Sequence, residues 1–254
     1  MKKSTTGLGL ALFTLLTIPD MANSQNKEDL PPEATEFYEP VPKKIEAGSQ
    51  PGEAPSDAIV LFNGTNLDAW QSAEDSSEAK WNVSNGVFTV NPGSGPIETK
   101  QEFGDVQLHL EWRAPQEIKG EGQGRGNSGV FLMNNYEVQV LDSYESKTYT
   151  NGQAGSIYKQ SPPLVNVTKS PEEWNVYDII FKAPRFNKDG MLIKPATVTV
   201  LHNGVLVQDH FEIKGPTRYT GIPHYTAHAD KLPIQLQDHG NLVSFRNIWV
   251  RNLD

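Results

Sequence analysis

The strongest constraint on the fold is a series of short apolar or alternating runs, separated by turn residues, that begins near Ala58. In "DVQLHLEWRA", apolar side chains recur at every second position from Val106 to Trp112, which is the period of a β-strand with one buried face. Asn-Gly pairs at residues 85–86 and 203–204 each lie between two such runs, as in two-residue β-hairpins. The pattern predicts an all-β fold over residues 57–254, an antiparallel β-sandwich or jelly roll.

Residues 1–24 have the organisation of a secretory signal peptide. Two lysines precede the apolar run "LGLALFTLLTI", and small residues suit cleavage near Ser24–Gln25. The apolar run is too short to span a bilayer. The chain contains no cysteine, which excludes disulfides and a lipid-modified N-terminal cysteine. We therefore expect a periplasmic or secreted protein without a membrane span.

Residues 25–56 are rich in proline and charge and show no apolar period, so they predict an extended tether or a strap over the domain surface. The whole chain carries 22 basic and 31 acidic residues, a net charge of −9. This balance argues against a nucleic-acid partner, which requires a clustered basic surface. No feature of the sequence indicates a protein partner.

The glycines between Gly124 and Gly129 spell G-x-G-x-x-G, a pattern found in dinucleotide-binding loops. Such a loop must connect a strand to a helix, but here "VFLMNNYEVQVLD" follows and indicates strand, turn and strand. The nucleotide interpretation is therefore rejected. The alternative is a loop carrying Arg125 and Asn127, in which Gly129 allows a backbone or a ligand to approach closely.

The next run, "YEVQVLD", has one face apolar enough for a core, so Glu137 and Gln139 project from the opposite face. Near the C-terminus, "PIQLQDH" shows the same alternation, which places Gln237 and His239 on one face of a strand. Arg246 follows on the next strand. These side chains face solvent, or they line the concave face of a curved sheet. The second arrangement suits recognition of a polyol, which needs paired hydrogen-bonding groups.

Several segments together resemble a known family, namely the 3-keto-disaccharide hydrolases, also called the domain of unknown function 1080. The resemblance covers residues 58–253 and is carried, in order, by "LFNGTNLDAW", "GNSGVFL", "YEVQVLD", "EWNVYDIIF", "NGVLV" and "LPIQLQDHGNLVSFRNIWVR". It implies a concanavalin A-like or laminin-G-like jelly roll in a secreted bacterial protein. It also implies cleavage of glycosides by way of a 3-keto sugar.

A carbonyl at C3 of a sugar acidifies the C2 hydrogen and places the C1 oxygen where it can leave by elimination. The site then needs a base, a group that stabilises the O3 oxyanion, and a donor for the leaving oxygen. The candidate residues are Glu137 or His239 as the base; Arg125, Asn127 and Arg246 for the oxyanion or the hydroxyls; Gln139 and Gln237 for orienting the ring; and Lys159 as the donor.

A metal site is a separate hypothesis. "HYTAH" places His224 and His228 four residues apart, with Asp230 nearby, and a divalent ion would help to hold an enediolate. Flanking prolines argue against the helix that this spacing requires, so a loop over the mouth of the groove is favoured. No cofactor is required by the chemistry.

Two alternatives to this enzyme stay open. A jelly roll of this kind also serves as a non-catalytic, lectin-like carbohydrate-binding module, because a fold does not fix a function. A conventional glycoside hydrolase acting on unoxidised sugars is the other alternative, and it requires a pair of carboxylates at a defined separation.

Overall fold

The computed structural model describes Met1 and residues 30–253. Apart from Met1, the predicted signal peptide and its cleavage site lie outside the described residues. The chain divides into two units, residues 1–43 and residues 44–254, so the predicted extended segment is split between them. In its described part, the first unit contains a short 3-10 helix, η1 (Pro32–Thr35). Within the described residues, no helix has the length and apolar character needed to cross a membrane.

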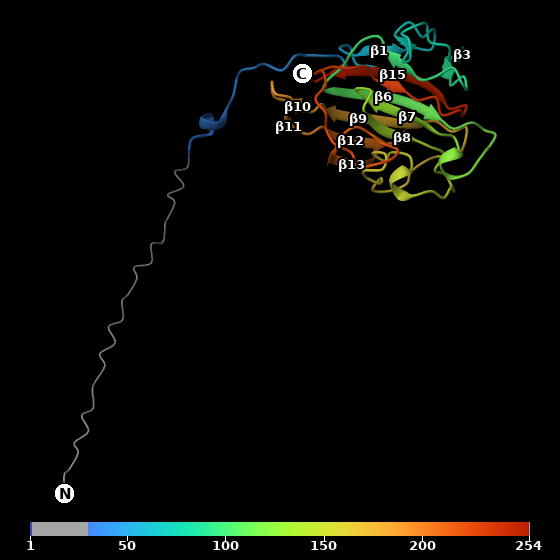
Figure 1. Cartoon of the computed structure of the whole chain (residues 1–254). Helices are drawn as coiled ribbons and strands as arrows, with labels where there is room; N and C mark the ends of the chain where they lie inside the picture. The colour runs from blue at the N-terminus through green and yellow to red at the C-terminus, as the bar shows by residue number, and fades with distance from the viewer. Residues whose placement is uncertain (2–29, 254) are drawn as a thin grey trace. The chain divides into compact units, whose positions relative to one another are not determined.

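The second unit consists of antiparallel sheets, as the sequence predicts (Figure 1). The larger sheet runs in the order β13 (Val205–Glu212), β12 (Thr197–His202), β9 (Asn175–Lys182), β6 (Val106–Arg113), β15 (Ser244–Asn252), β4 (Val87–Thr89), β3 (Asn82–Ser84), and β1 (Ile59–Phe62) also pairs with β15. The five-stranded sheet runs β2 (Trp70–Ser72), β5 (Ile97–Thr99), β14 (Gln235–Leu236), β7 (Ser128–Leu132), β8 (Tyr136–Val140). The remaining elements are β10 (Arg185–Phe186), β11 (Leu192–Lys194), η2 (Gly122–Gly124) and η3 (Thr150–Gly152).

Both predicted Asn-Gly hairpins are present. Asn85 and Gly86 connect β3 to β4, and Asn203 and Gly204 connect β12 to β13. All four residues have positive φ angles, between 52° and 78°. This conformation matches the right-handed twist of the paired strands, and asparagine and glycine adopt it at the lowest cost.

The core lies between the two sheets. Phe88 of β4 is fully buried and stacks on Phe245 of β15, with ring centroids 5.6 Å apart. Across the sandwich, Tyr136 of β8 packs on Phe181 of β9 at 5.7 Å. Alternation along each strand directs these aromatic rings inward, so the opposite face of β8 points away from the core.

A strap formed by residues 44–57 contacts the outer face of the larger sheet. The Gly52 carbonyl oxygen accepts hydrogen bonds from Asn247 Nδ2 and Trp249 Nε1, each at 2.9 Å. Arg251 of β15 donates to both carboxylate oxygens of Asp57, each at 2.8 Å. These contacts explain why His109, although it belongs to the polar face of β6, is buried.

Replacing Phe88 with alanine should destabilise the sandwich, because the ring touches aromatic side chains from both sheets. We expect the free energy of unfolding to fall by about 3–5 kcal/mol in chemical denaturation. Leu206→Ala on the exposed side of β13 is the matched control and should change it by less than about 0.5 kcal/mol. Equal losses in the two variants would contradict this account of the core.

Candidate active site

A cavity of about 620 Å³ lies over the outer face of β7, β8 and the end of β14. Its floor comes from strand positions that alternate with core residues, and its walls come from the loops around them. The lining residues are Gln123, Gly124, Asn127, Phe131, Glu137, Gln139, Tyr149, Tyr158, Lys159, Thr217, Tyr219, Gln237 and His239. The volume is that of a small-ligand site, and the lining combines aromatic rings with hydrogen-bonding side chains.

Glu137 lies on the floor of this cavity and is 4% exposed. Its backbone N–H donates to Thr217 Oγ1 at 3.0 Å, which holds the strand under the loop. Within the described residues, no group donates a hydrogen bond to its carboxylate in the side-chain orientations present. Burial therefore raises the pKa of Glu137 to about 8.

Gly129 provides the space that this carboxylate occupies. It lies on β7, opposite Gln139 of β8. A Cβ atom on Gly129 would lie 2.6 Å from Glu137 Oε1 and 2.9 Å from Phe131 Cε2. The third glycine of the G-x-G-x-x-G pattern is thus required by the neighbouring acid rather than by a nucleotide.

An amide chain runs from the cavity wall to Glu137. Gln123 Nε2 donates to the Gly152 carbonyl oxygen at 2.8 Å and to Thr148 Oγ1 at 3.0 Å. Gln139 Nε2 in turn donates to Gln123 Oε1 at 3.0 Å. Asn127, also in the lining, is buried and donates to the Gln123 carbonyl oxygen at 2.6 Å. Three predicted residues, Glu137, Gln139 and Asn127, are thereby brought together.

The rim of the cavity is aromatic and cationic. Lys159 Nζ lies 4.2 Å from the centroid of the Tyr219 ring and 5.8 Å from those of Tyr149 and Tyr158, within the range of cation–π attraction. It also donates to the Tyr219 carbonyl oxygen at 2.5 Å. Burial and a hydrogen bond with Tyr149 raise the pKa of Tyr158, so its hydroxyl keeps its proton.

Gln237 and His239 line the cavity beyond the end of β14. The Gln237 backbone N–H donates to the Gly129 carbonyl oxygen at 3.0 Å, so this segment continues beside β7. Its own carbonyl oxygen accepts from Ser128 Oγ at 2.7 Å. His239 is exposed at the cavity mouth, whereas Glu137 is buried on the floor.

Arg125 does not line the cavity. Its Nε donates to Asp142 Oδ2 at 2.6 Å, and its Nη2 donates to the Tyr144 carbonyl oxygen at 3.1 Å. The guanidinium therefore joins the glycine-containing loop to the segment after β8. The structure thus places Arg125 outside the cavity expected to hold a sugar, with its charge already paired with a buried carboxylate.

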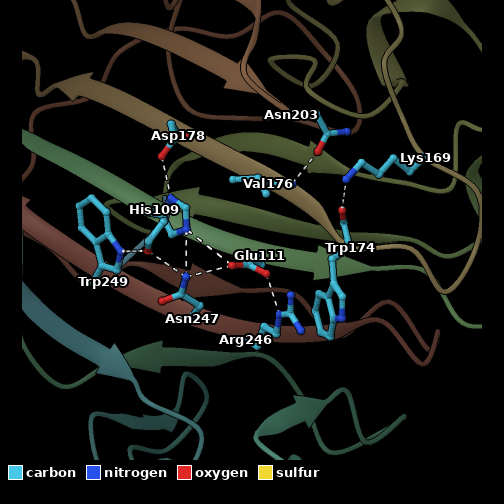
Figure 2. A network of polar contacts seen from close by, with 11 residues as sticks. His109, Glu111, Lys169, Trp174, Val176, Asp178, Asn203, Arg246, Asn247 and Trp249 are labelled. Atoms are coloured by element: carbon cyan, nitrogen blue, oxygen red, sulfur yellow. Dashed lines mark hydrogen bonds and ion pairs between the residues drawn. The ribbon is translucent and has the colours of Figure 1, made fainter. Parts of the chain in front are cut away.

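Arg246 lies on the other sheet. Its neighbour Phe245 is fully buried in the core, so alternation turns Arg246 to the outer face of the larger sheet (Figure 2). There its Nε donates to Glu111 Oε2 at 2.6 Å, and its guanidinium stacks on Trp174 at 4.1 Å. The sequence left open which face it occupies, and the structure separates it from the cavity.

The surroundings of Arg246 form a charged network under the strap. His109 Nδ1 lies 2.7 Å from Asp178 Oδ1, and its ring stacks on Trp249 (Figure 2). Burial alone would lower the pKa of His109, but Asp178 and Glu111 raise it to about 9. For Glu111, an acid, burial alone would raise the pKa, but hydrogen bonds from the His109 ring and from Asn247 lower it to about 2. The attraction between these opposite charges thus offsets the cost of burying them, which is characteristic of a structural ion network.

The three metal candidates do not form a ligand set. His228 Nε2 lies 2.7 Å from the Tyr136 hydroxyl, and its Nδ1 lies 2.8 Å from the Ala229 carbonyl oxygen. Both ring nitrogens are thus engaged, and His224 and Asp230 do not join them. Across residues 30–253, no group of three or more histidine, aspartate or glutamate side chains is arranged to bind a metal ion.

Sequence reasoning did not identify several lining residues, which are Gln123, Phe131, Tyr149, Tyr158, Thr217 and Tyr219. Most come from loops, where strand parity gives no information. Two had a usable signal. Tyr158 adjoins Lys159 in "SIYK", and Gln123 directly precedes the glycine pattern.

An antiparallel β-sandwich with a buried acid under a polar, aromatic cavity fits a carbohydrate-active protein, and the family and a curated relative make it an enzyme of the glycoside-cleaving class. Residues 57–251 match the family of the 3-keto-alpha-glucoside-1,2-lyase-like domain, and the chain belongs to that family. The predicted family resemblance is confirmed.

Known relatives cover most of the chain. A 3-keto-disaccharide hydrolase of Bacteroides thetaiotaomicron is 25% identical over 236 residues, which cover 77% of this chain and 78% of that protein. A crystal structure of a presumed glycosyl hydrolase from Parabacteroides distasonis is 52% identical, with a TM-score of 0.84 over 89% of this chain and 98% of that one. A second Parabacteroides distasonis structure, at 22% identity and a TM-score of 0.59, shares the fold.

Gly129→Ala should destabilise the protein and disturb the acid, because the added methyl group collides with the Glu137 carboxylate and the Phe131 ring. We expect a loss of about 1–3 kcal/mol in the free energy of unfolding. Gly124→Ala is the control, since a Cβ atom there meets nothing within 4 Å. If both variants kept wild-type stability in urea denaturation, the proposed steric role of Gly129 would be wrong.

Glu137→Gln should change how stability depends on pH. The native pKa of about 8 lies above the ordinary value of 4.5, so the stabilisation from the protonated acid is complete below pH 4.5 and is lost as the pH rises through 8. Glutamine stays neutral throughout. The stability of the wild type relative to the variant should therefore fall between these values, by at most about 1.4 kcal/mol per pH unit. A difference that stays constant with pH would contradict the raised pKa.

Proposed function

We propose that this protein cleaves 3-keto-glycosides by elimination, with Glu137 as the base that removes the C2 proton. The observation that carries the proposal is the buried, hydrogen-bond-poor carboxyl of Glu137 on the cavity floor, with its pKa raised to about 8. A general base is most effective when its pKa lies near the working pH. The family, and a relative named 3-keto-disaccharide hydrolase, support the same substrate class.

The reaction needs one base rather than two carboxylates. Ionised Glu137 takes the C2 proton, and the C2–H electrons form an enediolate with the C3 carbonyl. When the carbonyl re-forms, a C1–C2 double bond forms and the C1–oxygen bond breaks. Water can then add at C1 while a proton returns to C2, which gives net hydrolysis.

The composition of the lining favours this chemistry over a conventional glycosidase. Among the described residues that line the cavity, Glu137 is the one carboxylic acid. A conventional retaining or inverting enzyme needs a second carboxyl group at about 5–9.5 Å from the first. Asp142, the nearest carboxylate along the chain, is paired with Arg125 outside the lining.

Other lining residues fit the remaining roles. Lys159 at the rim carries a cation that can protonate the leaving oxygen. Gln237 and His239 also line the cavity and carry side-chain N–H groups that can donate to the O3 oxyanion. Tyr149 and Tyr219 offer ring faces on which a second sugar or an aglycone can stack. The N-terminal signal-like sequence supports action in the periplasm or outside the cell.

The decisive experiment compares a 3-keto-glucoside with its unoxidised parent, using purified protein from residue 25 onward. We expect aglycone release and enone absorbance with the keto sugar alone. The value of kcat/KM should rise about tenfold per pH unit and level off near pH 8, because the base must be ionised. Assays with and without a chelator would measure any dependence on a metal.

Glu137→Gln should lower kcat by about 10²–10⁴-fold while the protein stays folded. His239→Ala, at the exposed mouth, tests the other candidate base and should have the smaller effect. If His239→Ala lost more of kcat than Glu137→Gln, His239 rather than Glu137 would be the base. Binding of both sugars without turnover of either would support a lectin-like module instead.

A further inference from the structure

The amide chain beside Glu137 is anchored at the end that lies farthest from the acid. Both N–H groups of Gln123 have acceptors, because Nε2 donates to the Gly152 carbonyl oxygen and to Thr148 Oγ1. Gly152 belongs to η3, and its backbone position is itself fixed by a hydrogen bond to the Tyr149 carbonyl oxygen. Gln123 must therefore present its side-chain oxygen, an acceptor, to Gln139.

This anchor determines which side of the Gln139 amide faces the acid. Since Gln139 Nε2 donates to Gln123 Oε1 at 3.0 Å, its oxygen points the other way. That oxygen lies 2.9 Å from Glu137 Oε1 and 3.1 Å from the Ser128 carbonyl oxygen. The contact with Glu137 becomes favourable when Glu137 carries a proton, whereas the contact with the Ser128 carbonyl oxygen stays between two acceptors.

The alternative amide orientation satisfies an ionised acid but breaks the anchor. With its oxygen and nitrogen exchanged, Gln139 donates to Glu137 Oε1 at 2.9 Å and to the Ser128 carbonyl oxygen at 3.1 Å. Its oxygen then opposes Gln123 Oε1 at 3.0 Å. Relief requires Gln123 to turn as well, which removes its hydrogen bond to the Gly152 carbonyl oxygen.

We propose that Gln123 and Gln139 are positioning residues that hold the proton on Glu137 in the resting enzyme, and that ionisation of Glu137 requires rotation of the Gln139 amide. In the resting state the Glu137 hydroxyl donates to Gln139 Oε1. The inference rests on the proposed function, in which the ionised form of Glu137 is the base.

The arrangement connects sugar binding to activation of the base. Gln123 lines the cavity, so its oxygen can accept a hydrogen bond from a sugar hydroxyl. If a sugar hydroxyl binds the Gln123 amide in place of Gly152 and Thr148, Gln123 and Gln139 can turn together, and the Gln139 NH₂ group then faces Glu137. A hydrogen bond to the charged form of a carboxyl lowers its pKa. Polyol binding therefore favours loss of the Glu137 proton to solvent.

The test follows the protonation of Glu137 without any substrate, using the infrared carbonyl band of the protonated acid and Glu137→Gln to assign it. Gln123→Met removes the anchor and leaves the Gln139 amide with its long, 3.5 Å hydrogen bond to Asn127 Oδ1. We expect the pKa of Glu137 to fall by at least about one unit, which is a tenfold rise in its proton dissociation constant. Gln139→Met is the matched control, because it removes both the acceptor for the Glu137 proton and the NH₂ group that could turn toward the ionised acid, so the pKa of Glu137 should fall less than in Gln123→Met.

Equal titration of Glu137 in wild type and Gln123→Met, or an equal fall in both methionine variants, would overturn the proposal, since burial alone would then account for the pKa. If Gln123→Met does not fold, Gln123→Leu replaces it, since leucine also lacks the amide anchor without adding a charge. An unchanged pKa of Glu137 in that variant would also overturn the proposal. Because titration needs no turnover, absence of 3-keto-glycoside cleavage would refute the proposed function and leave this result standing.

Discussion

Burial of both faces of β8 is the constraint on which the site depends. One face packs Tyr136 and Val138 into the core between the sheets, while the other holds Glu137 beneath the cavity loops. All five residues of the strand are buried. A one-residue shift in register would put the acid into the core and a core residue into the cavity. The inter-sheet packing therefore fixes the position of the acid as firmly as it fixes the fold.

The sequence was sufficient for the architecture and for the floor of the site. Alternation identified the core face of β6, and the turn chemistry of Asn85-Gly86 and Asn203-Gly204 identified two hairpins. The same period-two argument placed Glu137 and Gln139 opposite the core. These successes share a cause, since strand geometry is local and repeats every two residues.

The walls of the site could not be derived in this way. Tyr149 and Tyr219 come from loops separated along the chain, and no local period brings them together. The two arginines are the converse case. A cation near a polar strand suggested a sugar contact, but Arg125 pairs with Asp142 and Arg246 with Glu111. Partners so distant in sequence become visible only when the sheets are assembled.

The lone carboxylic acid in the lining has a consequence for selectivity. Because the described lining holds one acid and no second carboxyl group, the proposed chemistry makes discrimination between substrates depend on the acidity of the sugar's own C2 hydrogen as well as on the shape of the cavity. Under the proposed function, an ordinary glycoside can occupy the same space and make the same hydrogen bonds without reacting. Unoxidised sugars then act as competitive inhibitors, so the ratio of oxidised to unoxidised glycoside sets the rate, and the enzyme depends on the oxidation step that precedes it.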